Sequence, residues 1–167
     1  MSETLEPALP DQLDQQAERL MRRLCDQELT IATAESCTGG MLAALLTDIE
    51  GAGHAFERGF VTYTKQAKAD LLGIDRGLLD HNDAVSEPVA RAMAEGALNR
   101  SKADIALGVT GFAGPAGYGC EEGLVHFALT RRGGSTVHRV EHFGPAGRGP
   151  VRVKSLRTLL EMLEEAL

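Results

Sequence analysis

The sequence predicts a three-layer α/β/α domain built on a mixed, partly parallel sheet. Segments with the apolar spacing of amphipathic helices alternate with short runs rich in β-forming residues. Two of these runs, near the carboxyl end, are separated by a short glycine-containing turn and predict an antiparallel hairpin. The 167 residues suffice for one domain with a sizeable core. We therefore expect a flexible start at residues 1–10 and a single domain over 11–167.

In the first half of the chain, helices and strands are expected to alternate. Apolar residues between Leu13 and Leu24 recur on one face of a helix that begins at Asp11. Thr64 is a helix-capping residue type and Gly73 a helix-ending one, so a short helix is expected between them. The expected elements are the helix 11–25, the strand 29–34, the helix 41–50, the strand 56–63 and the helix 64–73.

The second half contains the predicted hairpin. Ser86 is expected to cap a helix whose first turn holds Glu87 and Pro88. The apolar run that follows has the length of a central strand. The last helix is expected to start near Val151. The expected elements are a loop or helical turn at 76–83, the helix 86–101, the strand 104–110, a glycine-rich loop at 111–123, the strands 124–130 and 135–143, a loop at 144–150 and the last helix.

Composition excludes several classes of partner. The formal net charge is −7, and an acidic surface repels the phosphate backbone of nucleic acids. No apolar run approaches the ~18 residues of a membrane-spanning helix. The first residues are acidic and no basic residue precedes Arg19, unlike a signal peptide. We therefore expect a cytoplasmic protein with neither nucleic acid nor membrane as partner.

Cysteine and histidine spacings argue against a disulfide framework and against a metal centre. Cys25, Cys37 and Cys120 are widely spaced and include no C-x-x-C pair. His138 and His142 are four residues apart in a predicted strand, where we expect surface histidines rather than ligands. We expect no metal and no other cofactor.

The stretch 33–40 joins a strand to a helix and organises the rest of the chain. Ser36 and Thr38 supply hydroxyl groups there, while Gly39 and Gly40 let the backbone approach a ligand. The first free N–H groups of the helix would point at that ligand, which suits an anion or the oxyanion of an acyl transfer. The alternative is that the hydroxyls only cap the helix and the glycines only make a tight turn.

A hydroxyl nucleophile at Ser36 needs a base, and no histidine lies near it in the sequence. Lysine serves as base in Ser–Lys variants of the triad when burial or neighbouring cations disfavour its ammonium form. Lys68 lies among alanines and leucines, which is compatible with burial, whereas Lys65 has polar neighbours. The alternative for both lysines is a solvated helix face.

Other candidate residues are expected at the same edge of the sheet, because ligands of such sheets bind beyond the carboxyl ends of strands. Tyr63 ends one predicted strand, and Thr110 with Gly111 ends another. The loop that follows contains Gly114 and either cradles a phosphate through backbone N–H groups or is an ordinary surface loop. Positive charge near the last helix comes from Arg148 and Arg152.

Four segments, taken together and in this order, resemble the CinA C-terminal domain family. They are AESCTGG at 34–40, GFVTY at 59–63 with Lys68 shortly after, AVS at 84–86, and VTGFAGP at 109–115. The resemblance extends over about residues 11–165. The family is often labelled competence/damage-inducible and includes nicotinamide-nucleotide amidohydrolases, also called NMN deamidases.

The resemblance implies hydrolysis of the carboxamide of nicotinamide mononucleotide to nicotinic acid mononucleotide and ammonia. It implies Ser36 as the nucleophile, Lys68 rather than Lys65 as the general base, and Tyr63 as a third catalytic residue. Helix-mouth N–H groups would hold the oxyanion. No metal or cofactor is implied, and a homodimer is expected. The substrate-binding residues that it implies are Thr38, Gly39, Gly40, Thr110, Gly111, Gly114 and Arg148.

Two departures from the family pattern support an alternative function. The segment 117–123 is short and acidic where the family usually has a longer loop with a Lys-Pro-Val-Gly run, and Arg148 lacks the aspartate that usually precedes it. The alternative is a catalytically silent module that binds a nucleotide or joins a stress-response complex. The retained Ser36, Tyr63 and Lys68 favour the enzyme.

Overall fold

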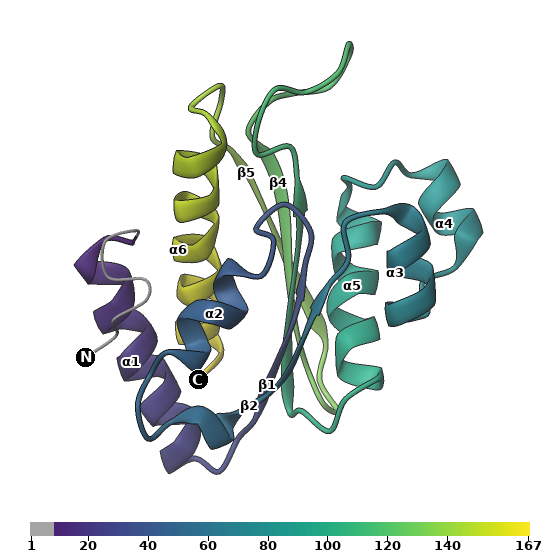
Figure 1. Cartoon of the computed structure of the whole chain (residues 1–167). Helices are drawn as coiled ribbons and strands as arrows, with labels where there is room; N and C mark the ends of the chain where they lie inside the picture. Colours follow the sequence, from purple (N-terminus) through teal and green to yellow (C-terminus); the bar gives the residue numbers. More distant parts are fainter. Residues whose placement is uncertain (1–8) are drawn as a thin grey trace.

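A five-stranded mixed sheet lies at the centre of the computed structural model, which describes residues 9–167 (Figure 1). Its strands are ordered β2-β1-β3-β4-β5. Residues 1–8 of the predicted flexible start lie outside the described residues. The strands are β1 (Ile31–Glu35), β2 (Phe56–Val61), β3 (Ile105–Gly111), β4 (Leu124–Arg131) and β5 (Thr136–His142).

The sheet changes from parallel to antiparallel along its width. Strand β1 pairs in parallel with both β2 and β3, whereas β4 is antiparallel to β3 and to β5. The β4–β5 pair confirms the hairpin predicted from the turn at 131–134. The carboxyl ends of β1, β2 and β3 therefore meet at one edge of the sheet, where ligands of such sheets bind.

Helices cover both faces of the sheet, which confirms the predicted α/β class (Figure 1). One layer holds α1, α2 and α6, and the other holds α3, α4 and α5. A 3-10 turn, η1 (Gly53–Ala55), precedes β2. The helices are α1 (Asp11–Asp26), α2 (Met41–Thr47), α3 (Lys65–Leu72), α4 (Arg76–His81), α5 (Glu87–Asn99) and α6 (Arg148–Ala166). None of the helices in residues 9–167 has the length and apolarity needed to cross a bilayer.

Small residues let α5 lie close to β3. A Cβ at Gly108 would lie 2.8 Å from the backbone nitrogen of Ala94 and 2.9 Å from the carbonyl oxygen of Ala90. Both alanines and the glycine therefore set the distance between helix and sheet. The other layer buries larger side chains of α1, α2 and α6 against the opposite face, among them Leu20 and Leu160.

Three helix ends differ from the prediction. Helix α6 begins at Arg148, about one turn earlier than expected, so this arginine lies in the first turn and not in a loop. Helix α2 ends at Thr47 rather than near residue 50. Ser86 makes no side-chain capping bond to α5, and its hydroxyl donates instead to the carbonyl of Asp83. The predicted cap at Thr64 is confirmed, since it accepts from the N–H of Ala67 at 3.0 Å.

Candidate active site

The turn that carries Ser36 is tied to the strands on both sides of β1. The Ser36 N–H donates to the carbonyl of Val109 in β3 at 3.1 Å, and the Thr62 N–H donates to the carbonyl of Glu35 at 2.8 Å. These two hydrogen bonds link the end of β1 to β3 on one side and to the residue that follows β2 on the other. Such a junction holds Ser36 on a rigid part of the sheet.

The carboxylate of Glu35 holds the turn together. It is 1% exposed and accepts hydrogen bonds from the Thr38 hydroxyl at 2.6 Å and from the N–H groups of Gly40 and Leu42 at 3.1 Å each and of Ala43 at 2.8 Å. A buried carboxylate requires such donors in place of water. Four donors converge on it, so Glu35 acts as the cap of α2 from the strand that precedes it.

The expectation that the first N–H groups of α2 are free for an oxyanion is wrong. Those of Gly40, Leu42 and Ala43 are bound to Glu35, and that of Met41 donates to the Thr38 carbonyl at 3.2 Å. The Thr38 hydroxyl also donates to the Glu35 carboxylate, and Thr38 is completely buried. Within residues 9–167, the N–H groups of Cys37 and Thr38 donate to no oxygen of another residue. These two remain available beside Ser36.

Gly39 and Gly40 serve the turn through their backbone. Their φ angles are +61° and +94°, a region that favours glycine. The guanidinium of Arg152 covers Gly39, since a Cβ there would lie 3.3 Å from its Nη2 atom. Arg152 Nε also donates to the Cys37 carbonyl at 2.8 Å. A side chain at position 39 would therefore displace this arginine as well as strain the turn.

Lys68 of α3 reaches Ser36 from the other layer. Its Nζ atom lies 3.0 Å from Ser36 Oγ, 2.8 Å from the carbonyl oxygen of Thr62 and 3.3 Å from that of Tyr63. Lys68 is fully buried, and Ser36 is 7% exposed. No carboxylate within the described range forms an ion pair with Lys68. Burial alone lowers the pKa of Lys68 from 10.5 to about 8.

A neutral Lys68 amine fits its three neighbours. It has two N–H donors, which match the carbonyls of Thr62 and Tyr63, and one lone pair, which can accept the Ser36 hydroxyl proton. The solvated-face alternative for Lys68 is therefore excluded by its burial. Lys65 fits that alternative instead, because it is partly exposed and pairs with Asp80 at 3.8 Å.

Cys37 is adjacent to Ser36 but is not a competing nucleophile. Burial raises the pKa of its thiol to about 12, so the thiolate is scarce at neutral pH. Ser36 is therefore the side chain of this turn that has both a neighbouring amine and some access to solvent.

Tyr63 lies at the mouth of the site with its ring outward. Its side chain is 65% exposed, and its contact with Lys68 runs through its carbonyl oxygen rather than through its hydroxyl. The backbone of Tyr63 thus orients Lys68 whatever the side chain does.

Thr110 and Gly111 are the last two residues of β3, at the same edge of the sheet as Ser36. The Thr110 hydroxyl donates to the carbonyl of Ala84 at 2.6 Å and is 1% exposed, so it fastens the loop before α5. At Gly111 a Cβ would lie 2.7 to 2.9 Å from atoms of Leu124 and Val125. Both residues act here through packing and backbone geometry.

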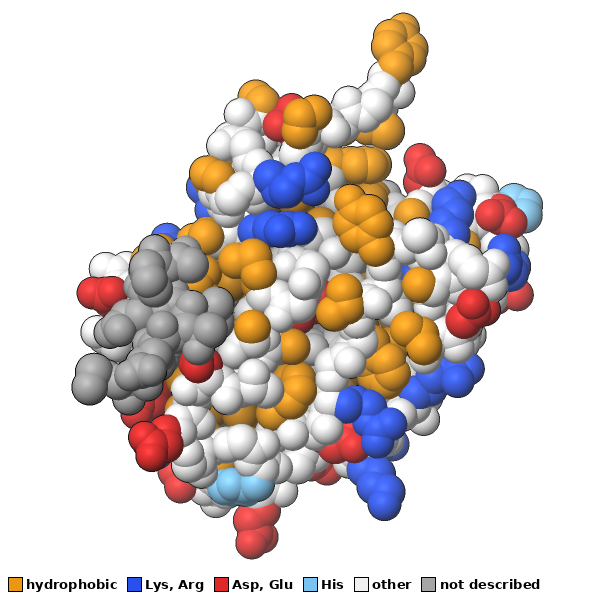
Figure 2. Space-filling model, in the orientation of Figure 1, with side chains coloured by type: hydrophobic (Ala, Val, Ile, Leu, Met, Phe, Trp, Pro, Cys, Tyr) orange, Lys and Arg blue, Asp and Glu red, His pale blue; other side chains and the backbone are white. Residues whose placement is uncertain are grey.

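Two arginines of α6, one turn apart, border the site. A Cβ at Gly114 would lie 2.9 Å from Nη2 of Arg148, so this guanidinium lies against the glycine-rich loop. Arg152 lies over Gly39, as described above. Figure 2 shows basic side chains gathered over the upper part of α6, below the loop that projects from the molecule. The arrangement concentrates positive charge beside Ser36 in a protein of net negative charge.

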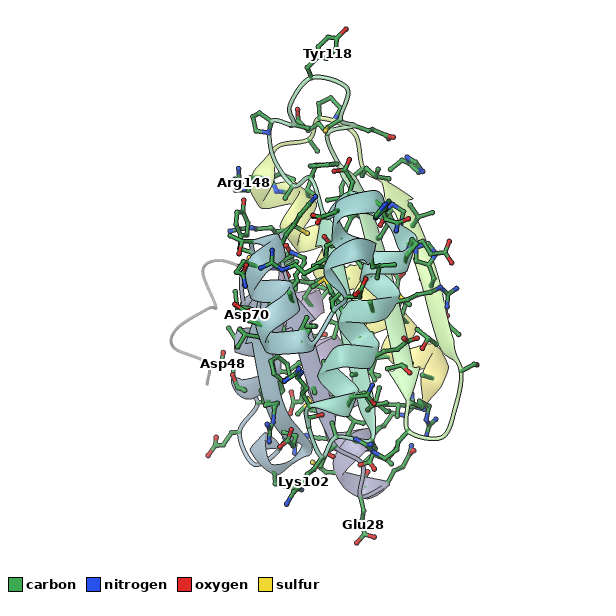
Figure 3. All side chains as sticks on the ribbon, turned by 90° about the vertical axis from the view of Figure 1, so that its right-hand side faces the viewer. Glu28, Asp48, Asp70, Lys102, Tyr118 and Arg148 are labelled. Atoms are coloured by element: carbon green, nitrogen blue, oxygen red, sulfur yellow. The ribbon has the colours of Figure 1, made fainter. Side chains whose placement is uncertain are left out.

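The glycine-rich loop projects away from the body of the protein. Tyr118 at its tip is fully exposed, and Figure 3 shows it far beyond Arg148. Glu121 pairs with His142 of β5 at 2.7 Å, so its carboxylate is directed towards the sheet edge. The acidic residues of this loop are thus held in part by β5.

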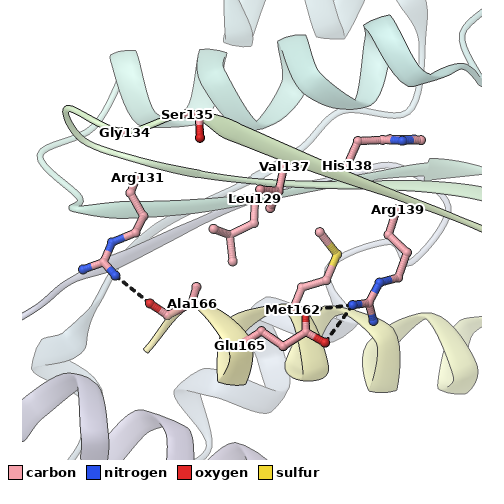
Figure 4. A pocket seen from close by; sticks show the side chains of 10 residues that line it. All are labelled: Leu129, Arg131, Gly134, Ser135, Val137, His138, Arg139, Met162, Glu165 and Ala166. Carbon is pink, nitrogen blue, oxygen red and sulfur yellow. Dashed lines mark hydrogen bonds and ion pairs between the residues drawn. The ribbon is translucent and has the colours of Figure 1, made fainter.

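A pocket of about 460 Å³ lies at the opposite end of the sheet (Figure 4). It lies between the β4–β5 hairpin and the carboxyl end of α6, and its polar groups bond to one another: Arg131 donates to the Ala166 carbonyl at 2.6 Å, and Arg139 pairs with Glu165. None of the predicted site residues lines it. The predicted site residues lie instead at the Ser36 end of the sheet.

Sequence reasoning missed three parts of the site. The role of Glu35 as a helix cap depends on the backbone path of the turn, although the spacing between a carboxylate and the following helix was a usable signal. The carbonyls of Thr62 and Tyr63 leave no trace in residue type. The contact between Arg152 and the Cys37 carbonyl joins residues 115 positions apart.

The histidine prediction also needs correction. His138 is mostly buried, and its Nε2 atom lies 3.0 Å from Nδ1 of His126 on β4. His142, in contrast, is exposed as expected. The described residues include no group of three or more His, Cys, Asp or Glu side chains placed to hold a metal ion.

Comparison with curated proteins finds relatives that are longer than this chain. It is 52% identical over 115 residues to a CinA-like protein of Akkermansia muciniphila, covering 68% of this chain and 28% of the relative. It is 45% identical over 156 residues to a CinA-like protein of Mycolicibacterium vanbaalenii, covering 92% of this chain and 35% of the relative. The chain thus spans about a third of the length of these relatives.

Comparison with solved structures finds close neighbours of similar length. The competence/damage inducible protein CihA of Agrobacterium tumefaciens superposes with a TM-score of 0.91 at 43% identity, covering 94% of this chain and 96% of that one. A CinA superfamily protein of Escherichia coli gives a TM-score of 0.87 at 37% identity, covering 93% and 90%. The family model described as CinA C-terminal domain matches residues 13–167. The chain therefore belongs to the CinA C-terminal domain family.

Proposed function

We propose that the protein is an amidohydrolase that converts nicotinamide mononucleotide to nicotinic acid mononucleotide and ammonia. The single observation that carries the proposal is the buried contact of 3.0 Å between Lys68 Nζ and Ser36 Oγ. A lysine that is buried without a carboxylate partner is a base that works near neutral pH. The choice of substrate rests on the family resemblance and on the basic border of the site.

The chemistry follows from this pair. Ser36 Oγ attacks the carboxamide carbon while the Lys68 amine takes its proton. The tetrahedral intermediate collapses by cleavage of the C–N bond, and the Lys68 ammonium protonates the leaving amine, which departs as ammonia. Water then attacks the ester on Ser36, with Lys68 again taking and returning one proton. The N–H groups of Cys37 and Thr38 are the proposed donors to the oxyanion.

Arg148 and Arg152 are proposed to hold the substrate phosphate. A guanidinium binds phosphate through paired N–H donors, and both arginines lie on the first turns of α6 beside the site. Gly114 lets Arg148 approach the loop, and Tyr63 offers its exposed ring at the mouth. We propose that Tyr63 contributes to catalysis through its backbone carbonyl, which orients the Lys68 amine. The reaction needs no metal or cofactor, and we place the protein in the cytoplasm.

Release of ammonia from purified protein tests the proposal. Nicotinamide mononucleotide should be hydrolysed faster than nicotinamide riboside, which lacks the phosphate, and faster than NAD, which is bulkier. The Ser36→Ala variant is the matched control for contaminating amidases, since it should bind the nucleotide but release ammonia about 10³-fold more slowly or less. Binding of the mononucleotide without ammonia release by the wild-type protein would instead establish the silent module.

A further inference from the structure

The two peptide units that carry the proposed oxyanion donors are held in different ways. The Cys37 N–H belongs to a peptide whose carbonyl, on Ser36, accepts the Gly39 N–H at 3.1 Å. The Thr38 N–H belongs to the next peptide, whose carbonyl, on Cys37, accepts from Arg152 Nε at 2.8 Å. The first peptide is therefore fixed within the turn, and the second from a helix 115 positions away in the sequence.

Arg152 determines the direction of the Thr38 N–H. The described backbone contains no cis peptide bond, and in a trans peptide the C=O and N–H bonds point in opposite directions. A carbonyl held towards Arg152 therefore directs the Thr38 N–H away from it. Arg152 comes from the layer of α6, whereas Lys68 reaches Ser36 from the layer of α3 (Figure 1). The Thr38 N–H is thus directed to the side of the turn on which Lys68 meets Ser36.

The guanidinium of Arg152 is suited to hold this carbonyl in one orientation. A hydrogen bond from a charged donor is about twice as strong as one between neutral groups. Arg152 is half-buried, and within residues 9–167 it forms no ion pair that would draw it elsewhere. Its neighbours Val151 and Leu156 are fully buried, so this turn of α6 is fixed against the body of the protein.

We propose that Arg152 is a positioning residue for the oxyanion, since it holds the 37–38 peptide with the Thr38 N–H directed at the developing negative charge. This role rests on the proposed acyl transfer to Ser36 and is separate from the phosphate contact proposed above for Arg152. A donor that is oriented before the reaction needs no reorganisation when the charge develops, and one such donor contributes about 10²- to 10³-fold to kcat. Arg152 acts here through the peptide and does not itself touch the oxyanion.

Two substitutions of matched length separate the hydrogen bond of Arg152 from its charge. In Arg152→Gln, the side-chain amide nitrogen takes the place of Nε, so a donor to the Cys37 carbonyl remains without the positive charge. In Arg152→Met, a methyl group takes that place and no donor remains. Arg148→Met, one turn earlier on α6, removes the other arginine proposed to hold the phosphate. Arg157→Met, at an exposed position of the same helix, is the control for the loss of a charge.

Hydrolysis of nicotinamide riboside isolates the positioning role, because this substrate has no phosphate for an arginine to hold. With the riboside, Arg152→Met should lower kcat by about tenfold or more, Arg152→Gln should recover most of that loss, and Arg157→Met should match the wild type. With nicotinamide mononucleotide, both Arg152 variants and Arg148→Met should in addition raise KM. The proposal is overturned if riboside kcat is unchanged in Arg152→Met, or if it falls equally in Arg152→Met and Arg152→Gln.

Crystal structures of the two Arg152 variants test the positioning without any substrate. Arg152→Met should show the 37–38 peptide rotated or in two orientations, whereas Arg152→Gln should keep the wild-type orientation. A peptide that keeps the wild-type orientation in Arg152→Met overturns the proposal, whatever the activity of that variant. If the wild-type protein hydrolyses neither substrate, the proposed amidohydrolase function fails instead, and the peptide orientation alone decides whether Arg152 positions the Thr38 N–H.

Discussion

The turn after β1 and the turn after β2 both bury an ionisable side chain, and they treat it in opposite ways. Glu35, the last residue of β1, turns its carboxylate into the first turn and receives four hydrogen-bond donors, three of them backbone N–H groups. Lys68, which closes the second turn from α3, receives two carbonyls and a hydroxyl but no carboxylate. The first turn surrounds its carboxylate with hydrogen-bond donors, whereas the second leaves an amine without a counter-ion, and burial lowers the pKa of that amine to about 8.

The difference separates a structural group from a reactive one. A buried charge with a complete set of partners contributes rigidity, because any movement leaves a donor or acceptor unpaired. A buried amine without a counter-ion loses its proton easily and can take one from a neighbour. Glu35 precedes Ser36 in the chain and Lys68 Nζ lies 3.0 Å from Ser36 Oγ, so the candidate site combines a rigid turn with a buried amine that has no counter-ion.

The largest effect is expected from breaking the Ser36–Lys68 contact. Each single alanine variant should lower kcat by about 10³-fold or more, and the double variant should be little worse, because the two groups act as a unit. Lys68→Arg should be as damaging as Lys68→Ala, since a guanidinium stays protonated. Steady-state ammonia release measures all four. The assignment of base fails if Lys68→Arg keeps near-normal turnover, and Lys65→Ala is the mild control.

Removing the charge of Glu35 should destabilise the protein by weakening the turn after β1. Glu35→Gln directs an amide N–H₂ group at backbone N–H donors, so the protein should lose about 3 kcal/mol of unfolding free energy. Urea denaturation measures this loss. Glu50→Gln, on the surface, should change the midpoint little. An unchanged midpoint for Glu35→Gln would show that the four bonds are dispensable and that the two turns do not differ as described.

Removing the charge of Lys68 should have the opposite effect on stability. Burial lowers its pKa from 10.5 to about 8, so Lys68→Met should raise the unfolding free energy at pH 7 by up to about 3 kcal/mol while activity is lost. The unfolded chain binds more protons between these two values, so wild-type stability should rise from about pH 8 to 10.5 and then level off. The Lys68→Met variant should lack that rise. A destabilised variant at pH 7 would mean that the lysine is held by favourable contacts.

The pH dependence of activity reports the same amine directly. Only the neutral form of Lys68 can accept the Ser36 proton, and its pKa is about 8. kcat/KM should therefore rise roughly tenfold between pH 7 and pH 9 and level off above that, from the titration of one group. A pH profile that is flat through this range would exclude Lys68 as the titrating base.

The smallest effect is expected from the Tyr63 hydroxyl. Since Tyr63 contacts Lys68 through its carbonyl, Tyr63→Phe should change kcat by less than about threefold. Tyr63→Ala, which removes the ring at the mouth, should raise KM more than it lowers kcat. A loss of about 100-fold in Tyr63→Phe would mean instead that the hydroxyl relays a proton.

The sequence alone determined the order of elements, the hairpin and the segments that form the site. Helical and strand periodicities are local properties, so α1, α5 and the β4–β5 pair follow from residue spacing. The pairing of Ser36 with Lys68 instead of Lys65 was already favoured by the apolar neighbours of Lys68. The family motifs supported the same choice.

Only the tertiary structure decided where charges and hydrogen bonds go. Whether Glu35 faces solvent or α2 depends on the path of eight residues of backbone, and whether Thr110 faces a ligand or the Ala84 carbonyl depends on a loop 26 positions away. Arg152 reaches the Cys37 carbonyl across the interface of α6 with the sheet. Burial sets the pKa of Lys68, and burial is a sum over neighbours from separate elements, which no local pattern of residues encodes.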